Sequence, residues 1–320
     1  MSFIEVKDLK VHYPIRGGFF NKVIDHVYAV DGVSLTIEEG KTYGLVGESG
    51  SGKSTIGKAI IGLEKIKSGK IIYEGKEING KFRNRRSEYN RNVQMIFQDS
   101  LSSLNPKKRV IDLISEPLRN FENLTLDEEK RKVSELLEIV GMNREDIYKY
   151  PHEFSGGQRQ RLGIARAVAT KPKLIIADEP VSALDLSVQA QVLNYMKDIQ
   201  EQFGLSYLFI SHDLGVVKHM CDYMFIMYRG RFVETGTKND IYKNPEHFYT
   251  KRLIAAIPEV HPEKRLENKK RRIEIEKEYL KNEKKYYDEN GRVFDLKKLT
   301  DTHFVALKDE IVKNNGKGGK

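Results

Sequence analysis

A glycine-rich loop at residues 47–55 limits what this chain can fold into more than any other feature. Its nine residues, GESGSGKST, fit the pattern G-x-x-x-x-G-K-[ST], in which backbone N–H groups surround phosphate oxygens. An apolar run at 43–46 precedes the loop, and apolar residues at helical spacing follow it over 55–63. This strand–loop–helix setting favours a phosphate site at the positive end of a helix over a plain flexible turn.

Within such a loop the lysine and the hydroxyl that follows it have separate tasks. Lys53 is predicted to reach the β- and γ-phosphates of a nucleotide, and the Ser54 hydroxyl to bind Mg²⁺. The predicted phosphate-binding residues are Gly47, Glu48, Ser49, Gly50, Ser51, Gly52, Lys53, Ser54 and Thr55.

Two carboxylates, Asp178 and Glu179, follow the apolar run at 174–177. A strand end can place Asp178 near a Mg²⁺ ion and Glu179 beside an attacking water. Acidic residues at strand ends are usually solvated, so this pattern is weak alone. Together with the phosphate loop it indicates a site for nucleotide hydrolysis.

The order of strands and helices predicts an α/β fold. Uninterrupted apolar runs at 174–177 and 205–210 flank a helical pattern over 188–203, which is typical of a mostly parallel sheet covered on both faces. Before the loop, alternating residues predict short strands at 3–6, 28–30 and 33–37.

A block in the middle of the chain has a different, helical character. After a break at Asn105-Pro106, helices are predicted over 110–118 and 128–140, the second stopped by Gly141. The block is predicted to be an insertion into the sheet domain. We therefore expect a domain over 1–260 with a helical subdomain at about 98–165.

Residues 261–320 are predicted to be a charged C-terminal extension, either a solvated helix or a loose segment with a disordered end. The chain holds 55 basic and 46 acidic residues, a net charge of +9, and this segment alone holds 17 and 12 of them. Because much of the excess lies in a mixed-sign segment, no nucleic-acid partner is expected.

Composition also limits the cellular compartment in which the protein is expected. No stretch approaches 18 consecutive apolar residues, and the first ten residues carry charges where a secretory signal needs an apolar core. Cys221 is the single cysteine, which excludes an internal disulfide framework or a multi-thiolate metal site within this sequence. A cytoplasmic protein is predicted.

Residues 154–161, FSGGQRQR, distinguish between classes of nucleotide-binding protein better than any other stretch. A serine and two glycines ahead of a helix predicted over 161–169 form a second anion site by the same amide geometry. Two separated phosphate-binding segments in one chain cannot both surround one nucleotide. In two chains that face each other, the segment of one chain can meet the phosphate loop of the other. An ordinary helix cap is the alternative.

With these motifs, residues 3–260 resemble the ATP-binding subunit of an ABC transporter. Residues 47–55 match the family's Walker A loop, and Asp178 and Glu179 match Walker B and the catalytic glutamate. The signature motif is matched by Ser155, Gly156, Gly157 and Gln158, with Phe154 where leucine is commoner. The resemblance implies a P-loop NTPase (RecA-like) core, an antiparallel β portion at the N-terminus and an inserted helical subdomain.

Three weaker motifs occur in the family's order. Gln98 after Phe97 resembles the Q-loop, residues 182–185 resemble the D-loop ending in Asp185, and His212 resembles the switch histidine. Singly they would indicate a strand end, a helix cap and a structural histidine. The family also stacks an aromatic side chain on adenine. By its position after the first strand, Tyr13 resembles this adenine-stacking residue. Tyr28 is a second candidate, because an insertion over 14–27 separates the two tyrosines. The alternative to both is that the tyrosine belongs to the core and contacts no nucleotide.

Finer similarity points to the oligopeptide and dipeptide importer ATPases. It lies in MIFQD at 95–99 with SLNP at 103–106, in the run at 182–191, in the stretch 244–258 and in HFVA at 303–306. Some members carry a cysteine cluster that binds iron–sulfur, so this chain resembles the cluster-free subunit of the ATPase pair. The alternative is an ABC ATPase for nickel, another small solute or export.

The resemblance implies a mechanism and partners. The resemblance implies that ATP lies between the phosphate loop of one subunit and the signature segment of a second ATPase subunit, and the similarity to peptide importers favours a paralogue as that subunit. Glu179 polarises water, His212 positions the γ-phosphate, and Gln98 binds Mg²⁺ with Ser54 and Asp178. Two integral-membrane permease subunits and, indirectly, an extracytoplasmic peptide-binding protein complete the transporter. The chain would sit peripherally at the cytoplasmic face of the cell membrane.

Overall fold

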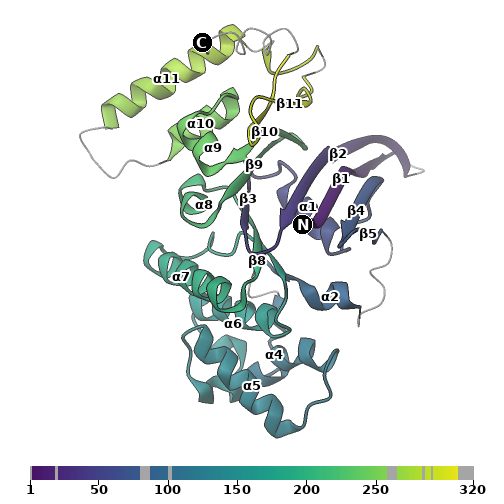
Figure 1. The fold of residues 1–320 in the computed structure, drawn as a ribbon, viewed down its shortest axis with the longest axis vertical. Coiled ribbons are helices and arrows are strands. Elements are labelled where there is room, and N and C mark those ends of the chain that lie inside the picture. Colours follow the sequence, from purple (N-terminus) through teal and green to yellow (C-terminus); the bar gives the residue numbers. More distant parts are fainter. Residues whose placement is uncertain are drawn as a thin grey trace.

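Two sheets and the helices around them make up the described part of the chain (Figure 1). The computed structural model describes residues 2–18, 21–79, 87–99, 103–257, 265–282, 285–289 and 291–308. Within these residues no helix is both long and apolar enough to cross a bilayer.

The larger sheet has eight strands among the described residues, in the order β11-β12-β10-β9-β3-β8-β7-β6. Strands β9, β3, β8, β7 and β6 run parallel to one another, whereas β10, β12 and β11 are each antiparallel to their neighbours. The bounds are β3 (Thr42–Val46), β6 (Val93–Ile96), β7 (Leu174–Asp178), β8 (Ser206–Ser211), β9 (Tyr223–Tyr228), β10 (Arg231–Thr237), β11 (Leu296–Lys298) and β12 (Phe304–Ala306). The mostly parallel α/β core is thus confirmed.

Strand β7 shows why its apolar run is uninterrupted. Leu174 and Ile176 belong to a core on one face of the sheet, and Ile175 and Ala177 to a core on the other. Because successive side chains of a strand point to opposite faces, a strand covered on both sides must be apolar throughout. Helix α1 (Lys53–Ile60) contributes to the first core, and α6 (Gly156–Val168), α7 (Leu186–Phe203) and α8 (Leu214–Met220) contribute to the second.

The smaller sheet is antiparallel, in the order β2-β1-β4-β5, which confirms the expected N-terminal portion. Its strands are β1 (Ser2–Gly17), β2 (Lys22–Glu38), β4 (Ser68–Tyr73) and β5 (Lys76–Glu77). The prediction of short strands interrupted by an insertion over 14–27 was wrong. Pairing continues through Pro14 with His26 and Gly17 with Lys22, so the segment prolongs one hairpin. Most of its side chains are exposed on both faces, so no burial pattern marks it in the sequence.

Between the neighbouring strands β6 and β7 the described chain is helical, as the pattern in the middle of the sequence predicted. The segment contains α4 (Val110–Arg119), α5 (Leu126–Ile139), two short 3₁₀ turns (Arg144–Tyr148 and Pro151–Glu153) and α6. Helix α5 begins two residues before its predicted start, because the Thr125 side chain and Glu128 form a capping box. Helix α6 begins at Gly156 rather than at 161, and Ser155 caps it in the same way.

The segment after residue 264 does more than extend into solvent. Most described side chains of α11 (Arg265–Asn282) are exposed, although Tyr279 stacks on Phe248 of α10 (Phe248–Ala256) with ring centroids 3.8 Å apart. Beyond it, β11 and β12 join the edge of the large sheet next to β10. The interpretation of a loose extension was wrong for this part, because Tyr286, Tyr287 and the β12 residues Val305 and Ala306 are buried. The predicted boundary at 260 and the predicted disordered end of the segment 261–320 lie outside the described residues.

A buried ion pair connects this C-terminal segment to β10. His303 Nε2 lies 2.7 Å from Glu234 Oε1, and both side chains are almost fully buried. Glu234 also accepts the backbone N–H groups of Glu246 and His247, before α10. Burial lowers the pKa of the His303 imidazole, but the hydrogen bond and charge of Glu234, with contributions from Asp240 and Glu246, outweigh it and raise the pKa above 6.5.

This pair predicts a pH-dependent stability. A histidine whose pKa is raised by folding stabilises the native state fully below its unfolded pKa, and that contribution is lost as pH rises through the folded value. His303→Gln keeps a donor without a titrating charge. We expect the advantage of the unchanged protein over this variant, measured by urea unfolding, to shrink as pH rises above the unfolded-state pKa of about 6.5. The exposed His219→Gln is the control, and an advantage that grew with pH would contradict the assignment.

Candidate nucleotide-binding site

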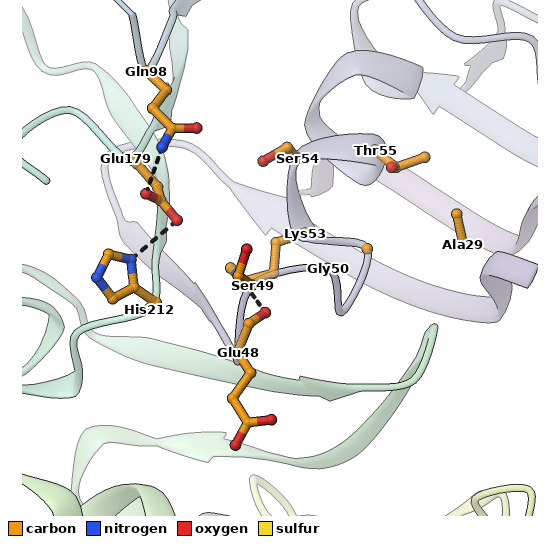
Figure 2. Close-up of a pocket in the computed structure, with 11 residues that line it drawn as sticks. Ala29, Glu48, Ser49, Gly50, Lys53, Ser54, Thr55, Gln98, Glu179 and His212 are labelled. Carbon is orange, nitrogen blue, oxygen red and sulfur yellow. Dashed lines mark hydrogen bonds and ion pairs between the residues drawn. The ribbon is translucent and has the colours of Figure 1, made fainter.

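A cavity of about 470 Å³ lies where β3, β6, β7 and β8 end, at the carboxyl edge of the parallel strands (Figure 2). Ligands of open α/β sheets bind at this edge because loops from several strands meet there. The cavity is lined by Ala29, Glu48, Ser49, Gly50, Gly52, Lys53, Ser54, Thr55, Gln98, Glu179 and His212.

The phosphate loop connects β3 to α1 in a tight space that only glycine fits at two positions. A Cβ atom on Gly47 would lie 2.2 Å from the Met227 carbonyl oxygen, and one on Gly52 would lie 2.0 Å from the Ala29 carbonyl oxygen. Gly52 also has a φ of 107°, in the left-handed region. No described side chain caps the N-terminus of α1, so its first N–H groups are available to an anion.

Lys53 is buried at the start of α1, and its ammonium is directed back over the loop. Its Nζ donates to the carbonyl oxygens of Gly47 at 2.7 Å and Glu48 at 2.8 Å. Burial lowers the pKa of this ammonium, while the charges of Glu179, Asp178 and Glu48 oppose the shift. The geometry therefore holds a cation beside the amides that would face phosphate.

Ser54, which lines the cavity, contacts Asp178 at the end of β7. The Ser54 hydroxyl donates to Asp178 Oδ1 over 2.7 Å, across 124 residues of sequence. Burial raises the pKa of Asp178, and the Ser54 hydrogen bond and the charge of Lys58 partly offset it. Hydroxyl and carboxylate oxygens are the donors that Mg²⁺ prefers.

Glu179 stands immediately after β7 in an uncommon backbone conformation. Its φ is 47°, and its N–H donates to the Ile210 carbonyl oxygen. Such a conformation is costly for a residue with a Cβ and persists only where surrounding contacts fix it. It turns the carboxylate into the cavity, where Gln98 Nε2 donates to Oε2 over 2.9 Å and His212 Nδ1 lies 3.1 Å from Oε1 (Figure 2). Three distant segments thus converge on one carboxylate.

Other predicted residues lie elsewhere on the described surface. None of Ser155, Gly156, Gly157, Gln158 and Asp185 lines the cavity, and all but Gly157 are exposed. The first four begin α6, and Asp185 occupies the N-cap position of α7. The structure of one chain therefore does not bring the signature segment to the phosphate loop.

Ser51 and the two candidate aromatic residues also lie outside the cavity lining. The Ser51 side chain is buried, and its carbonyl oxygen accepts the Gly230 N–H. Burial raises the pKa of the Tyr13 hydroxyl, and the neighbouring Glu64 and Thr55 side chains also act on it. Tyr28 instead makes an edge contact with His12, with ring centroids 4.5 Å apart.

Sequence reasoning missed two residues that contact the loop. Ala29 lines the cavity from β2, and Tyr249 of α10 accepts a loop N–H through its hydroxyl. Nothing in the sequence around Ala29 indicates this role. Tyr249 lies in the stretch 244–258, whose similarity to the peptide-importer ATPases indicates family membership but no contact with the loop.

Comparison with known families agrees with this fold. Residues 30–182 match the family described as ABC transporter, and residues 233–289 match the oligopeptide/dipeptide transporter C-terminal region. The chain belongs to the ATP-binding proteins of ABC transporters, a family of nucleotide-binding ATPases.

Individual relatives are similar over nearly the whole chain. The oligopeptide transport ATP-binding protein OppF of Lactococcus lactis is 57% identical over 306 residues, which cover 96% of each chain. The dipeptide transport ATP-binding protein DppF of Escherichia coli is 45% identical, covering 83% of this chain and 80% of that protein. Among solved structures, the ATP-binding cassette MJ0796 in a dimeric post-hydrolysis state with ADP and Pi has a TM-score of 0.64 at 25% identity, covering 73% of this chain and 98% of that one.

Proposed function

We propose that this chain is the ATP-hydrolysing subunit that powers oligopeptide or dipeptide import through an ABC transporter. The proposed cargo rests mainly on one observation. The chain is 57% identical to an oligopeptide transport ATP-binding protein along 96% of both sequences. The match to the transporter C-terminal region over residues 233–289 supports the same choice.

In this proposal the phosphate loop binds the nucleotide. The N–H groups of residues 47–55 and the Lys53 ammonium hold the β- and γ-phosphates, and Tyr13 stacks on adenine. Tyr13 is favoured over Tyr28 because Thr55, which lines the cavity, is near enough to act on the pKa of its hydroxyl, whereas Tyr28 packs on His12.

Ser54 and Asp178 carry oxygen atoms that suit Mg²⁺. Ser54 and Asp178 supply a hydroxyl and a carboxylate oxygen that already lie 2.7 Å apart. The Gln98 amide oxygen is turned toward the side of the cavity where Ser54 lies (Figure 2). The ion would neutralise charge on the phosphate oxygens, which favours transfer to water.

Glu179 acts as the general base in this scheme. A carboxylate oxygen accepts more than one hydrogen bond, so the contacts with Gln98 and His212 fix the side chain and leave lone pairs for a water. Glu179 takes the proton of that water, His212 is placed to contact the γ-phosphate, and Gln98 links the reacting end to the helical segment after β6.

A second ATPase subunit would complete each site. The α6 N-terminus, with Ser155, Gly156, Gly157 and Gln158, is a phosphate cradle that lies outside the cavity of its own chain. Two subunits arranged head to tail bring the signature segment of each to the loop of the other, with Asp185 between them. A paralogue is the proposed partner.

Two permease subunits are the proposed membrane partners, with an extracytoplasmic peptide-binding protein acting indirectly. A cavity of about 490 Å³ lies between β6 and the helical segment, lined among others by Phe97, Glu116, Phe121 and Arg166. It is close to Gln98, so a permease loop seated there would sense the nucleotide site. In this proposal the subunit lies peripherally at the cytoplasmic face of the membrane.

The test of the cargo is uptake by the assembled transporter. Vesicles that contain the chain, its co-purified ATPase partner and its permeases are expected to accumulate labelled peptides when ATP is supplied. The same vesicles carrying Glu179→Gln are the control. ATP-driven accumulation of nickel or another small solute without any of peptide would contradict the proposal.

A further inference from the structure

Tyr249, far from the loop in sequence, contacts its first peptide group directly. The Glu48 backbone N–H donates to the Tyr249 hydroxyl oxygen over 2.8 Å, across 201 residues. Tyr249 is the second residue of α10 and is 1% exposed. This helix lies beside β9 and β10, outside the cavity that the nucleotide would occupy (Figure 1).

The same peptide group is held on its other side by Lys53. The N–H of Glu48 and the C=O of Gly47 belong to one planar peptide unit and point in opposite directions. Lys53 Nζ lies 2.7 Å from that carbonyl oxygen, while Tyr249 accepts the N–H. The two side chains therefore fix the rotation of the peptide that begins the loop.

Tyr249 is itself held rigidly, so its hydroxyl can act as a fixed support. Its ring packs on Tyr228 with centroids 4.5 Å apart, and its N–H donates to His247 Nδ1. Burial lowers the pKa of His247 to about 3, which keeps this imidazole neutral and able to accept. Glu234 of β10 accepts the N–H groups of Glu246 and His247, and so ties the start of α10 to the sheet.

We propose that Tyr249 is a positioning residue for the phosphate loop, acting through the peptide between Gly47 and Glu48. The inference rests on the proposed role of this loop in nucleotide binding. It gives the segment at 233–289, which matches the oligopeptide/dipeptide transporter C-terminal region, a direct connection to the nucleotide site.

Tyr249→Phe in the assembled transporter tests this role, because it removes the hydroxyl and keeps the ring. We expect the Kd and KM for ATP to rise about 2- to 10-fold, the range of one neutral hydrogen bond, with kcat changed less than about twofold. An interaction that supports ground and transition states equally changes KM and not kcat.

Tyr207→Phe is the matched control for a general loss of stability. Tyr207 is also fully buried, and its hydroxyl donates to the Met196 carbonyl oxygen, away from the loop. Both variants are expected to lower Tm in the absence of nucleotide, but only Tyr249→Phe should weaken ATP binding. Unchanged affinity in Tyr249→Phe, or an equal loss of affinity in both variants, would overturn the inference.

Lys53→Ala separates this inference from the proposed function. Loss of binding in Lys53→Ala with normal binding in Tyr249→Phe would refute only the role of Tyr249. Normal binding in Lys53→Ala would refute the nucleotide role of the loop, and the inference with it.

Discussion

Replacing Glu179 by glutamine is expected to slow ATP hydrolysis in the assembled transporter by about 100- to 10,000-fold, while ATP binding is retained. The amide keeps the shape of the side chain beside Gln98 and His212 but cannot take a proton from water. The phosphate loop and Lys53 are untouched, so the binding contacts remain. Single-turnover hydrolysis and equilibrium binding of ATP, measured on the same preparation, separate the two effects.

The exposed residue Glu201 of α7 offers a matched control, because Glu201→Gln makes the same chemical change far from the cavity. Near-normal turnover in Glu179→Gln would remove the general base from the mechanism. A parallel loss of ATP binding would show instead that the carboxylate holds the site together.

Lys53→Ala is expected to act on binding itself and to raise the Kd for ATP about 10- to 100-fold. Hydrogen bonds from an ammonium to phosphate are charge-assisted and stronger than neutral ones. The variant also leaves the Gly47 and Glu48 carbonyl oxygens without this donor, so the loop loses a contact that shapes it. Titration with a fluorescent nucleotide measures the change.

Lys65→Ala, at an exposed position after α1, is the control for loss of one positive charge. It is expected to bind ATP as the unchanged protein does. Unaltered affinity in Lys53→Ala would contradict the assignment of the loop.

The sequence predicted those parts of the site that a local pattern of apolar and polar residues marks within one segment. The phosphate loop, the strand before Asp178 and Glu179, and the strand before His212 are each marked by an apolar run followed by polar residues. Parallel strands that end at the same edge of a sheet bring such residues together, so Gln98, Glu179 and His212 converge as a consequence of the sheet order.

Helix starts and the N-terminal hairpin were predicted less well, for local reasons. Capping by Thr125 and Ser155 moved the starts of α5 and α6 ahead of the first apolar positions that mark periodicity. In the hairpin over 14–27, backbone pairing alone defines the strands, because few of its side chains are buried.

What the sequence determined by itself is the set of chemical groups: a glycine-rich loop, a lysine, two carboxylates, and a serine with two glycines at the start of a second helix. Only the tertiary structure decided that Tyr249 supports the loop and that the segment ending in β12 joins the large sheet through His303 and Glu234. Local patterns report which face of one element is buried, whereas these contacts join residues far apart in the chain. Their partners are selected by packing, which exists only once the whole sheet has formed.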